Sequence, residues 1–422
     1  MGRETYREFP KDDRVYVDRN EYFVFSFDER RTRYTSTMGC EARVLRVRGS
    51  FVDVFDGHDV YQVFIDTELV KEQKVLPGDF IQCAGVLTES SQGTQILAIH
   101  ELVIDRRSNS PLSRNPSNPD LVPFIESIRD SKERATLIES HLIVRDVENF
   151  LDGKGFLKVT TSSFDRVDTG LGSKPFKIQD ENLILRRDFD IATRAYLLCC
   201  PSVYQVGQVY RNEGKSTKNR NDFLLAQVFS HGKMTRGLEL GVDLIGNAFT
   251  KIGKEIPNIE NLDMVPFIRR YANTPVNSIL TSMESGLLLS TGDVEQVRLM
   301  MREAKKNVSV PTVVTGSITR DTPFAVTNRE NPNLTDDFRL IWKGRTILHG
   351  SQEIPTFTEQ NERYRQLIGE NYEHTLSEGE LRYLELLKYG MQDYWGMSVS
   401  MDLLIQIVLD ISDVRKLRPT IT

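Results

Sequence analysis

The residues best suited to chemistry lie between positions 203 and 229. Two runs rich in β-forming residues, 203–210 and 223–229, flank a polar, basic loop, and this pattern predicts a β-hairpin. Arg211 and Glu213 directly follow the first run. The planar guanidinium of an arginine fixed at a strand end can bind phosphate oxygens in two places. The hairpin therefore predicts a phosphate-binding site, and the alternative is an edge hairpin whose charged loop is only solvated.

The elements that would carry this hairpin begin with a β-rich region. Five short runs separated by turns occur at 42–47, 50–55, 60–65, 79–84 and 94–99, and they predict a small Greek-key β-barrel of the OB type. Residues 1–33 are polar and charged and are assigned only as an N-terminal extension. Residues 106–120 are rich in Pro, Ser and Asn and predict a linker.

Strands and helices alternate beyond the linker, which indicates an α+β domain. Apolar residues at one-face spacing predict a helix over 131–152 (Ile143, Val147, Phe150 and Leu151). Strands are predicted at 337–342 and 345–349, separated by Lys343 and Gly344. A helix is expected over 376–389, a buried helix over the nearly uniformly apolar segment 401–409, and a loop over 252–263.

Composition limits the functional classes. A chain of 422 residues is too long for one core, so two or three domains are expected. The net charge of −6 argues against a generally basic nucleic-acid binder but permits a local basic patch. The cysteines lack CxxC spacing, so we expect neither a zinc site nor a disulfide framework (Cys40, Cys83, Cys199 and Cys200). No apolar run suits a membrane span or a secretory signal, which favours a cytoplasmic protein.

From about residue 39 to residue 419 the chain resembles the class IIb aminoacyl-tRNA synthetases, which charge lysine, aspartate and asparagine. The resemblance rests on the barrel, on the helix over 131–152 followed by a strand that ends at Ser162 in place of the family's proline, and on the hairpin. It implies an N-terminal extension (1–33), an OB-type anticodon-binding-like domain (34–105), a linker (106–125) and a class II catalytic domain (126–422). It also implies a homodimer formed through the long helix.

The resemblance gives the barrel a role in reading the anticodon of tRNA, whose central base is a uridine in this group. Arg43, Phe51 and Gln62 occupy the family's reading positions. A base that stacks on an aromatic ring gains roughly 1–3 kcal/mol, and the other two side chains offer hydrogen bonds to its edge. The alternative is that Phe51 is a core residue of the barrel and the other two are ordinary surface residues.

In the catalytic domain the resemblance makes Arg211 a ligand of the ATP α-phosphate, Glu213 the acidic residue beside adenine, and Phe223 the ring that stacks on adenine. A Gly-rich segment at 169–176 is most like that of the lysine enzymes. The loop departs from the family because its histidine is absent and its glutamate is Asp222. ATP remains the expected nucleotide.

Further departures affect the metal and the third motif. Thr346 and His349 occupy the family's Mg²⁺-ligand positions, and neither is a natural ligand for an ion that prefers carboxylates, so no metal site is expected there. Ser398 and Ser400 replace glycines of the third motif, and Leu403 replaces its arginine. Losing one such catalytic group commonly costs about 10²- to 10³-fold in rate.

Glu353 is the position that indicates a substrate. The lysine enzymes carry a glutamate here for the substrate ammonium, so charge complementarity favours a cationic amino acid bound by Glu353 and its neighbour Gln352. The alternative is that Glu353 is a structural partner for Arg363.

These observations predict a divergent synthetase-like protein that binds tRNA and has weak or lost amino-acid activation. The first alternative is an active adenylate-forming ligase for lysine or a similar amino acid, with cations of the hairpin loop replacing the lost groups (Lys215, Lys218 and Arg220). Its acceptor would be tRNA or another molecule. The second alternative is a purely structural subunit.

Overall fold

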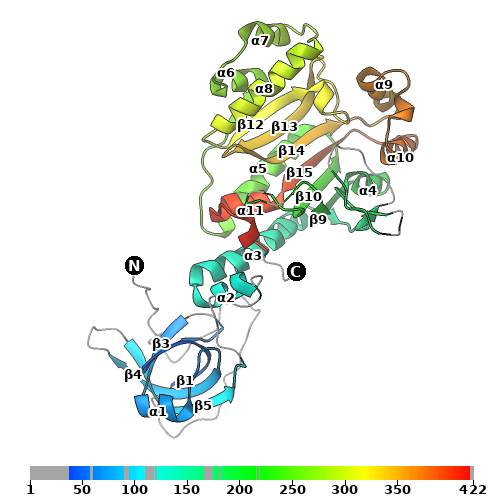
Figure 1. Ribbon diagram of the computed structural model, residues 1–422. Helices are drawn as coiled ribbons and strands as arrows, with labels where there is room; N and C mark the ends of the chain where they lie inside the picture. The colour runs from blue at the N-terminus through cyan, green and yellow to red at the C-terminus, as the bar shows by residue number, and fades with distance from the viewer. Residues whose placement is uncertain are drawn as a thin grey trace. The chain divides into compact units, whose positions relative to one another are not determined.

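The computed structural model describes residues 38–57, 60–89, 95–109, 118, 121–165, 174–179, 181, 183–214, 216–217 and 219–418. The extension at 1–33 lies outside the described residues, as do Lys215 and Lys218 and most of the Gly-rich segment. The chain divides into two compact units, one made of the described residues up to Ile138 and the other of Glu139–Arg418. Figure 1 labels their elements.

The first unit contains a closed five-stranded barrel with strand order β1-β2-β3-β5-β4. Its elements are β1 (Met38–Arg48), β2 (Phe51–Phe55), β3 (Val60–Ile65), α1 (Thr67–Gln73), β4 (Phe80–Glu89), β5 (Gln95–Arg106) and the flanking helix α2 (Val122–Arg129). Alternate residues point inward, and Val52, Val54, Val63 and Ile65 are fully buried. The period-2 pattern in the sequence therefore does bury one face of each strand, and the predicted OB-type barrel is confirmed.

The second unit is built on an eight-stranded mixed sheet with the order β11-β12-β13-β14-β15-β10-β9-β6. Its strands are β6 (Leu157–Lys158), β9 (Ser202–Tyr210), β10 (Asp222–His231), β11 (Glu260–Asp263), β12 (Thr312–Ile318), β13 (Leu334–Trp342), β14 (Arg345–Glu353) and β15 (Tyr394–Ser400). A two-stranded sheet joins β7 (Phe164–Asp165) to β8 (Ile184–Leu185). The predicted hairpin over 203–229 is the antiparallel pair β9–β10.

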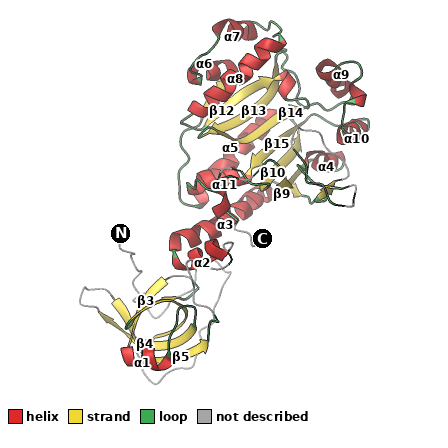
Figure 2. Cartoon of the chain, viewed as in Figure 1, coloured by secondary structure: helices red, strands yellow, loops and turns green. Residues whose placement is uncertain are grey.

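Helices cover both faces of the sheet (Figure 2). The helices that follow α2 are α3 (Ser131–Gly153), α4 (Asp190–Arg194), α5 (Met234–Lys251), α6 (Met264–Tyr271), α7 (Asn277–Glu284), α8 (Thr291–Asn307), α9 (Phe357–Ile368), α10 (Glu378–Leu387) and α11 (Met401–Leu409). Leu244 of α5 and Val147 of α3 share a core with Trp395 and Met397 of β15. A second core joins α6 and α8 to β12 and β13 on the other face. As predicted, 401–409 is a buried helix.

The sheet departs from expectation at one edge. The segment 252–263, expected to be a loop, ends in strand β11, which pairs in parallel with β12. Four residues carry too little pattern to predict a strand, so tertiary pairing decides this one. The turn between β13 and β14 lies where predicted, and Lys343 and Gly344 have φ values of 49° and 75°, as a two-residue type I′ hairpin turn requires.

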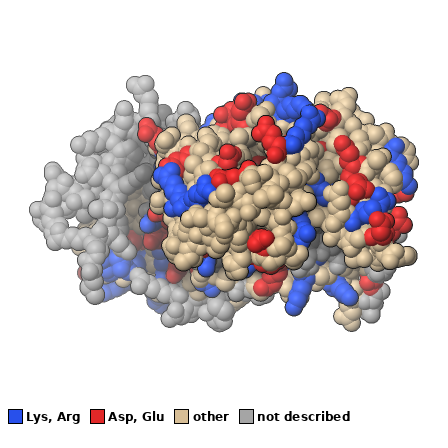
Figure 3. Space-filling model, turned by 90° about the horizontal axis from the view of Figure 1, so that it is seen from above, with Lys and Arg blue, Asp and Glu red and all other residues tan. Residues whose placement is uncertain are grey.

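Two general features of the described residues concern helix hydrophobicity and surface charge. No helix within the described ranges is long and apolar enough to cross a membrane. On the face of the protein seen in Figure 3, basic and acidic side chains lie among one another over the described surface, so neither sign dominates that view. Charge that could select a ligand must therefore be sought in local clusters.

Candidate active site

A row of polar residues crosses five neighbouring strands on one face of the sheet. Backbone pairing aligns Gln205 with Gln227, Gln227 with Ser398, Ser398 with His349, and His349 with Arg339. Directly paired residues point to the same side of a sheet. Met397 and Val399 flank Ser398 and pack in the core with α5, so the polar row lies on the face opposite α5.

Two further rows on this face bring Glu353 into the site. One aligns Phe229, Gly396, Ser351 and Asp337 across β10, β15, β14 and β13. The next pairs Tyr394 with Glu353. Successive rows are two residues apart along each strand and thus share the face. Gln352, between Ser351 and Glu353, points the other way and binds backbone groups of Gly232, Met234 and Tyr394.

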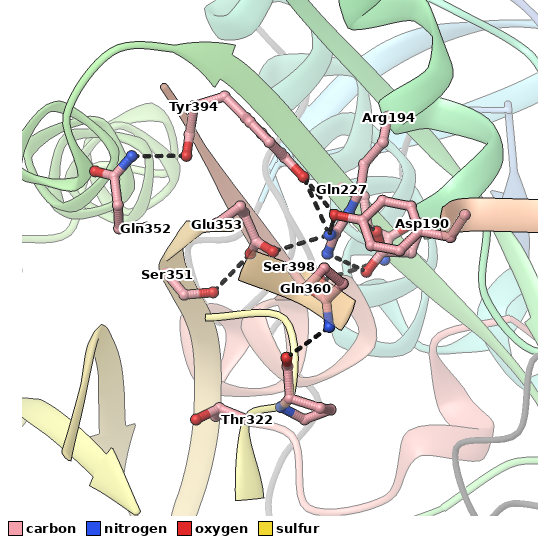
Figure 4. A network of polar contacts seen from close by, with 12 residues as sticks. Asp190, Arg194, Gln227, Thr322, Ser351, Gln352, Glu353, Gln360, Tyr394 and Ser398 are labelled. Atoms are coloured by element: carbon pink, nitrogen blue, oxygen red, sulfur yellow. Dashed lines mark hydrogen bonds and ion pairs between the residues drawn. The ribbon is translucent and has the colours of Figure 1, made fainter. Parts of the chain in front are cut away.

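Arg194 of the short helix α4 is the cation that Glu353 contacts. Its Nη1 lies 2.8 Å from Oε2 of Glu353, and both residues are only 3% exposed. Its Nη2 donates to Oδ2 of Asp190 at 3.0 Å, and Ser351 donates to the other carboxylate oxygen of Glu353 at 2.6 Å. Figure 4 shows this network. Arg363, the partner suggested by the sequence, instead donates to Thr322 and Thr327.

Aromatic side chains complete the surroundings of Arg194. The hydroxyls of Tyr383 and Tyr394 accept from Nη1 at 3.1 and 3.4 Å. The guanidinium carbon lies 5.1 Å from the ring centre of Phe229 and 5.0 Å from that of Phe324, which is the range of cation–π attraction. Arg194 is thus held by carboxylates, hydroxyls and rings together.

The electrostatics of this pair follow from burial. Burial raises the pKa of Glu353 to about 7 even though the adjacent Arg194 lowers it. Burial would lower the pKa of Arg194, but the carboxylates of Asp190 and Glu353 raise it well above its usual value. Arg194 is therefore a permanent cation at this site, and its charge compensates the carboxylates beside it.

A cavity of about 190 Å³ lies beside the pair. Its wall includes the rings and carboxylates already described together with residues from the segment that precedes β13 (Asp321, Thr322, Pro323, Phe324 and Ala325) and with His349, Ser351 and Ser398. The groups that remain for a ligand are mainly neutral and polar, because Arg194 already pairs with Asp190 and Glu353.

The hairpin residues lie at the other end of the same face. The guanidinium of Arg211 lies over the ring of Phe223, 5.1 Å from its centre, and its Nε donates to the Arg187 carbonyl. Glu213 is exposed beyond them. Arg220 donates to Asp222 and, at 2.8 Å, to the carbonyl of Arg418. The structure therefore brings Arg211 and Phe223 together, while Arg220 fastens the C-terminal segment.

The barrel presents a second candidate surface. Phe51 is 41% exposed and meets the exposed ring of Phe64 edge to face, with ring centres 5.5 Å apart. Gln62 donates to Asp53 at 3.1 Å, and the guanidinium of Arg43 lies 5.2 Å from the ring centre of Phe80. Strand pairing places the three predicted reading residues on the outer face of β1, β2 and β3. Phe51 is thus not a core residue.

Comparison with known proteins decides the family. The model of the class II tRNA synthetases (D, K and N) matches residues 123–419. This chain belongs to the class II tRNA synthetases. The lysine–tRNA ligase of Teredinibacter turnerae is 23% identical over 417 residues, covering 88% of this chain and 84% of the relative. That of Clostridium acetobutylicum is 22% identical over 445 residues, covering 94% and 86%.

The class II synthetase fold implies Mg²⁺, but the residues at the expected position do not fit this ion. Thr346 carries no carboxylate, and His349 lies 3.1 Å from Asp337. Partial burial lowers the pKa of His349, and the nearby Arg339 lowers it further. Arg339 also lines a cavity with Thr346. No group of three or more metal-ligating side chains occurs within the described ranges.

The segment predicted to be the third motif forms strand β15 and helix α11. Its side chains differ from those that the resemblance predicts. Ser398 accepts a hydrogen bond from Gln227 at 3.4 Å, and Leu403 is buried in the core. The acidic residue Asp402 pairs with Arg418 at 2.7 Å. Asp402, which precedes Leu403, is therefore bound to a cation from the C-terminal segment.

Sequence reasoning missed four charged or aromatic residues that the structure places in the second unit or on the barrel surface. Arg194 lies in a five-residue helix, and only folding brings it to Glu353. Arg339 and Lys305 are single charges in a strand and a helix. Phe64 alternates correctly with buried residues of β3, which was the one available indication that its ring is exposed beside Phe51.

Proposed function

We propose that this protein is a divergent class II synthetase that binds tRNA through its barrel and activates free lysine weakly or not at all. The observation that carries the proposal is the buried ion pair between Glu353 and Arg194. The carboxylate expected to hold the ammonium of a cationic amino acid already has a cationic partner from the same chain.

Lysine would have to displace this partner. A buried carboxylate and guanidinium that lose one member leave an uncompensated charge, which costs about 3–5 kcal/mol. Arg194 also holds Asp190, so moving it exposes two carboxylates to one substrate ammonium. Binding energy spent in this way is not available to the transition state.

The nucleotide half of the site supports retained binding of an adenine nucleotide. Arg211 lies over Phe223 at the hairpin, where the resemblance places the α-phosphate and adenine. A guanidinium can bind phosphate in two places, and an aromatic ring can stack on a base. The cationic and metal groups expected to hold a departing pyrophosphate are changed. The proposed protein therefore binds ATP but forms an aminoacyl adenylate slowly or not at all.

The barrel supports the tRNA half of the proposal. Two exposed rings, Phe51 and Phe64, lie on the same outer face as Arg46 and Arg48 of β1. Aromatic rings for stacking, arginines for phosphates and Gln62 for a base edge form the set that single-stranded RNA binders use. The relatives compared above are lysine–tRNA ligases, which supports tRNA as the partner.

Amino-acid-dependent exchange of pyrophosphate into ATP tests the enzymatic half. We expect no lysine-dependent exchange above the amino-acid-free background with Mg²⁺ present. Robust exchange with lysine would overturn the proposal and favour the active ligase. Exchange with another amino acid would show that Arg194 changes the amino-acid specificity instead.

The resemblance also predicts a homodimer formed through α3. Static light scattering, which measures the molar mass in solution, tests this prediction.

A further inference from the structure

A second cavity, of about 260 Å³, lies between α8 and the strands β12, β13 and β14. Apolar walls are formed by Met264, Met301, Ile318 and Ile341, and Thr346 faces the same space. Four cationic side chains complete the lining, namely Arg298, Arg302, Lys305 and Arg339, against one carboxylate, Asp321. The cavity thus carries an excess of positive charge although the chain as a whole is acidic.

Two of these four cations form ion pairs with carboxylates. Arg298 pairs with Asp321. Arg339 forms an ion pair with Asp337 at 3.7 Å, and Asp337 also accepts from Ser317 and contacts His349. Within the described part of the chain, Arg302 and Lys305 have no carboxylate within ion-pair distance. Arg302 and Lys305 therefore face this space without a carboxylate partner among the residues that the structure describes, and Arg339 shares its carboxylate with His349.

This arrangement is unfavourable unless an anion is bound. Like charges held close together repel each other, and the low dielectric of a partly buried site strengthens that repulsion. Burial, together with Arg339 and Arg345, lowers the pKa of Lys305. A folded protein keeps such a cluster at a cost in stability, and the common reason is a ligand of opposite charge.

The cavity adjoins the candidate active site. Asp321 lines both cavities. Arg339 of β13 lies opposite His349 of β14 in the sheet, and His349 lines the cavity beside Glu353. Thr346, at the family's metal-ligand position, lies on the wall of the cationic cavity. The position at which the family binds its metal therefore lies next to cationic side chains in this chain.

We propose that this cavity binds a multiply charged phosphate anion directly, without a divalent metal. The cationic side chains of α8 and β13 take the place of Mg²⁺, and the ligand is inorganic pyrophosphate or the polyphosphate end of a nucleotide. This inference deepens the proposed function by stating how the phosphate end of the same site is held.

Calorimetric titration of the full chain with inorganic pyrophosphate, in EDTA and then in MgCl₂, tests the inference. We expect binding in EDTA that excess Mg²⁺ does not strengthen. Lys305→Gln should weaken it by about tenfold or more, because a hydrogen bond to a charged group contributes about 1.5–3 kcal/mol. Arg302 is exposed, so Arg302→Gln should weaken binding less than Lys305→Gln does. Thr346→Glu should weaken it too, by adding a competing carboxylate.

Lys306→Gln is the matched control, because Lys306 is exposed on the same helix and does not line the cavity. It should leave affinity within about twofold of the parent, since exposed charges contribute little. Lys305→Gln should unfold at the same temperature as the parent or higher, so lost binding cannot reflect unfolding. Binding that requires Mg²⁺, or that falls equally in Lys305→Gln and Lys306→Gln, would overturn the inference.

Titrations with ATP and AMP identify the source of the phosphate. Lys305-dependent binding of ATP but not of AMP assigns the cavity to a nucleotide polyphosphate, and pyrophosphate binding alone assigns it to the free anion. Absence of binding by pyrophosphate and ATP in EDTA would contradict the inference. Each result is independent of lysine-dependent exchange, so failure of this inference is separable from failure of the proposed function.

Discussion

The guanidinium of Arg194 lies 2.8 Å from the carboxylate of Glu353, and the two side chains are buried together against Phe229 and Tyr394. In this position Arg194 supplies the positive charge that a bound cationic amino acid would otherwise bring. The packing of Arg194 against Glu353 therefore affects which ligand the site can bind.

Removing the guanidinium should make the site respond to lysine. Arg194→Ala leaves Asp190 and Glu353 without their cation, and we expect it to lower the free energy of unfolding by about 3–5 kcal/mol. Added lysine should raise the unfolding temperature of this variant by several degrees and leave the parent unchanged, because a ligand stabilises the state that binds it. Calorimetry measures both effects.

Norleucine and Arg194→Lys provide the controls for this rescue. Norleucine has the same chain length without the ammonium and should not stabilise Arg194→Ala. Arg194→Lys keeps a cation in place and should not respond to lysine. Equal stabilisation by lysine and norleucine would show that the pocket does not select charge.

The buried carboxylate should make stability depend on pH. Glu353 has an ordinary pKa of 4.5, and burial raises it to about 7 in the folded protein. Between these values the folded state binds a proton that the unfolded state lacks, so the contribution of Glu353 to stability is greatest below pH 4.5 and is lost as the pH rises through 7. The loss is on the order of 3 kcal/mol.

Comparison with Glu353→Gln isolates this titration from that of other groups. The difference in free energy of unfolding between parent and Glu353→Gln, measured in urea from pH 4 to pH 8, should move in favour of the variant as the pH rises. A difference that does not change with pH would show that Glu353 titrates at its ordinary pKa.

The barrel surface predicts a specific loss of tRNA binding. Phe51→Ala removes a ring that is 41% exposed, so the fold should be unaffected. Losing one stacked base costs about 1–3 kcal/mol, which weakens tRNA binding by about fivefold to 100-fold or more. A gel-shift titration measures this, with Phe164→Ala, an exposed ring outside the barrel, as the control. Equal affinity for Phe51→Ala and the parent would refute the anticodon role.

Helix α5 allows a matched test of the core. A Cβ at Gly237 would lie 2.6 Å from the ring of Trp395, whereas one at Gly246 meets nothing within 4 Å. Gly237→Ala should destabilise the protein by about 1–3 kcal/mol through overpacking. Gly246→Ala should stabilise it by about 0.5–1 kcal/mol through helix propensity. Urea unfolding of both variants measures the contrast, and similar effects would contradict the described packing of α5.

The sequence by itself determined the barrel, the central hairpin and the main helices. Alternating residues predicted the barrel strands because inward and outward positions differ in polarity, and the apolar spacing of Ile143, Val147 and Leu151 predicted the buried face of α3. The run over 401–409 predicted a buried helix, and the order of motifs predicted the family. These features depend on local pattern, which a linear sequence carries directly.

Only the tertiary structure decided the character of the site. Strand register aligns Gln205, Gln227, Ser398, His349 and Arg339 across the sheet. A one-residue shift of any of these strands would turn its side chain to the other face. Folding brings Arg194 to Glu353 and gathers Lys305 and Arg339 around Thr346. A charged residue acquires its partner only when the chain folds. The sequence therefore predicted the role of Glu353, and the structure showed that Arg194 is its partner.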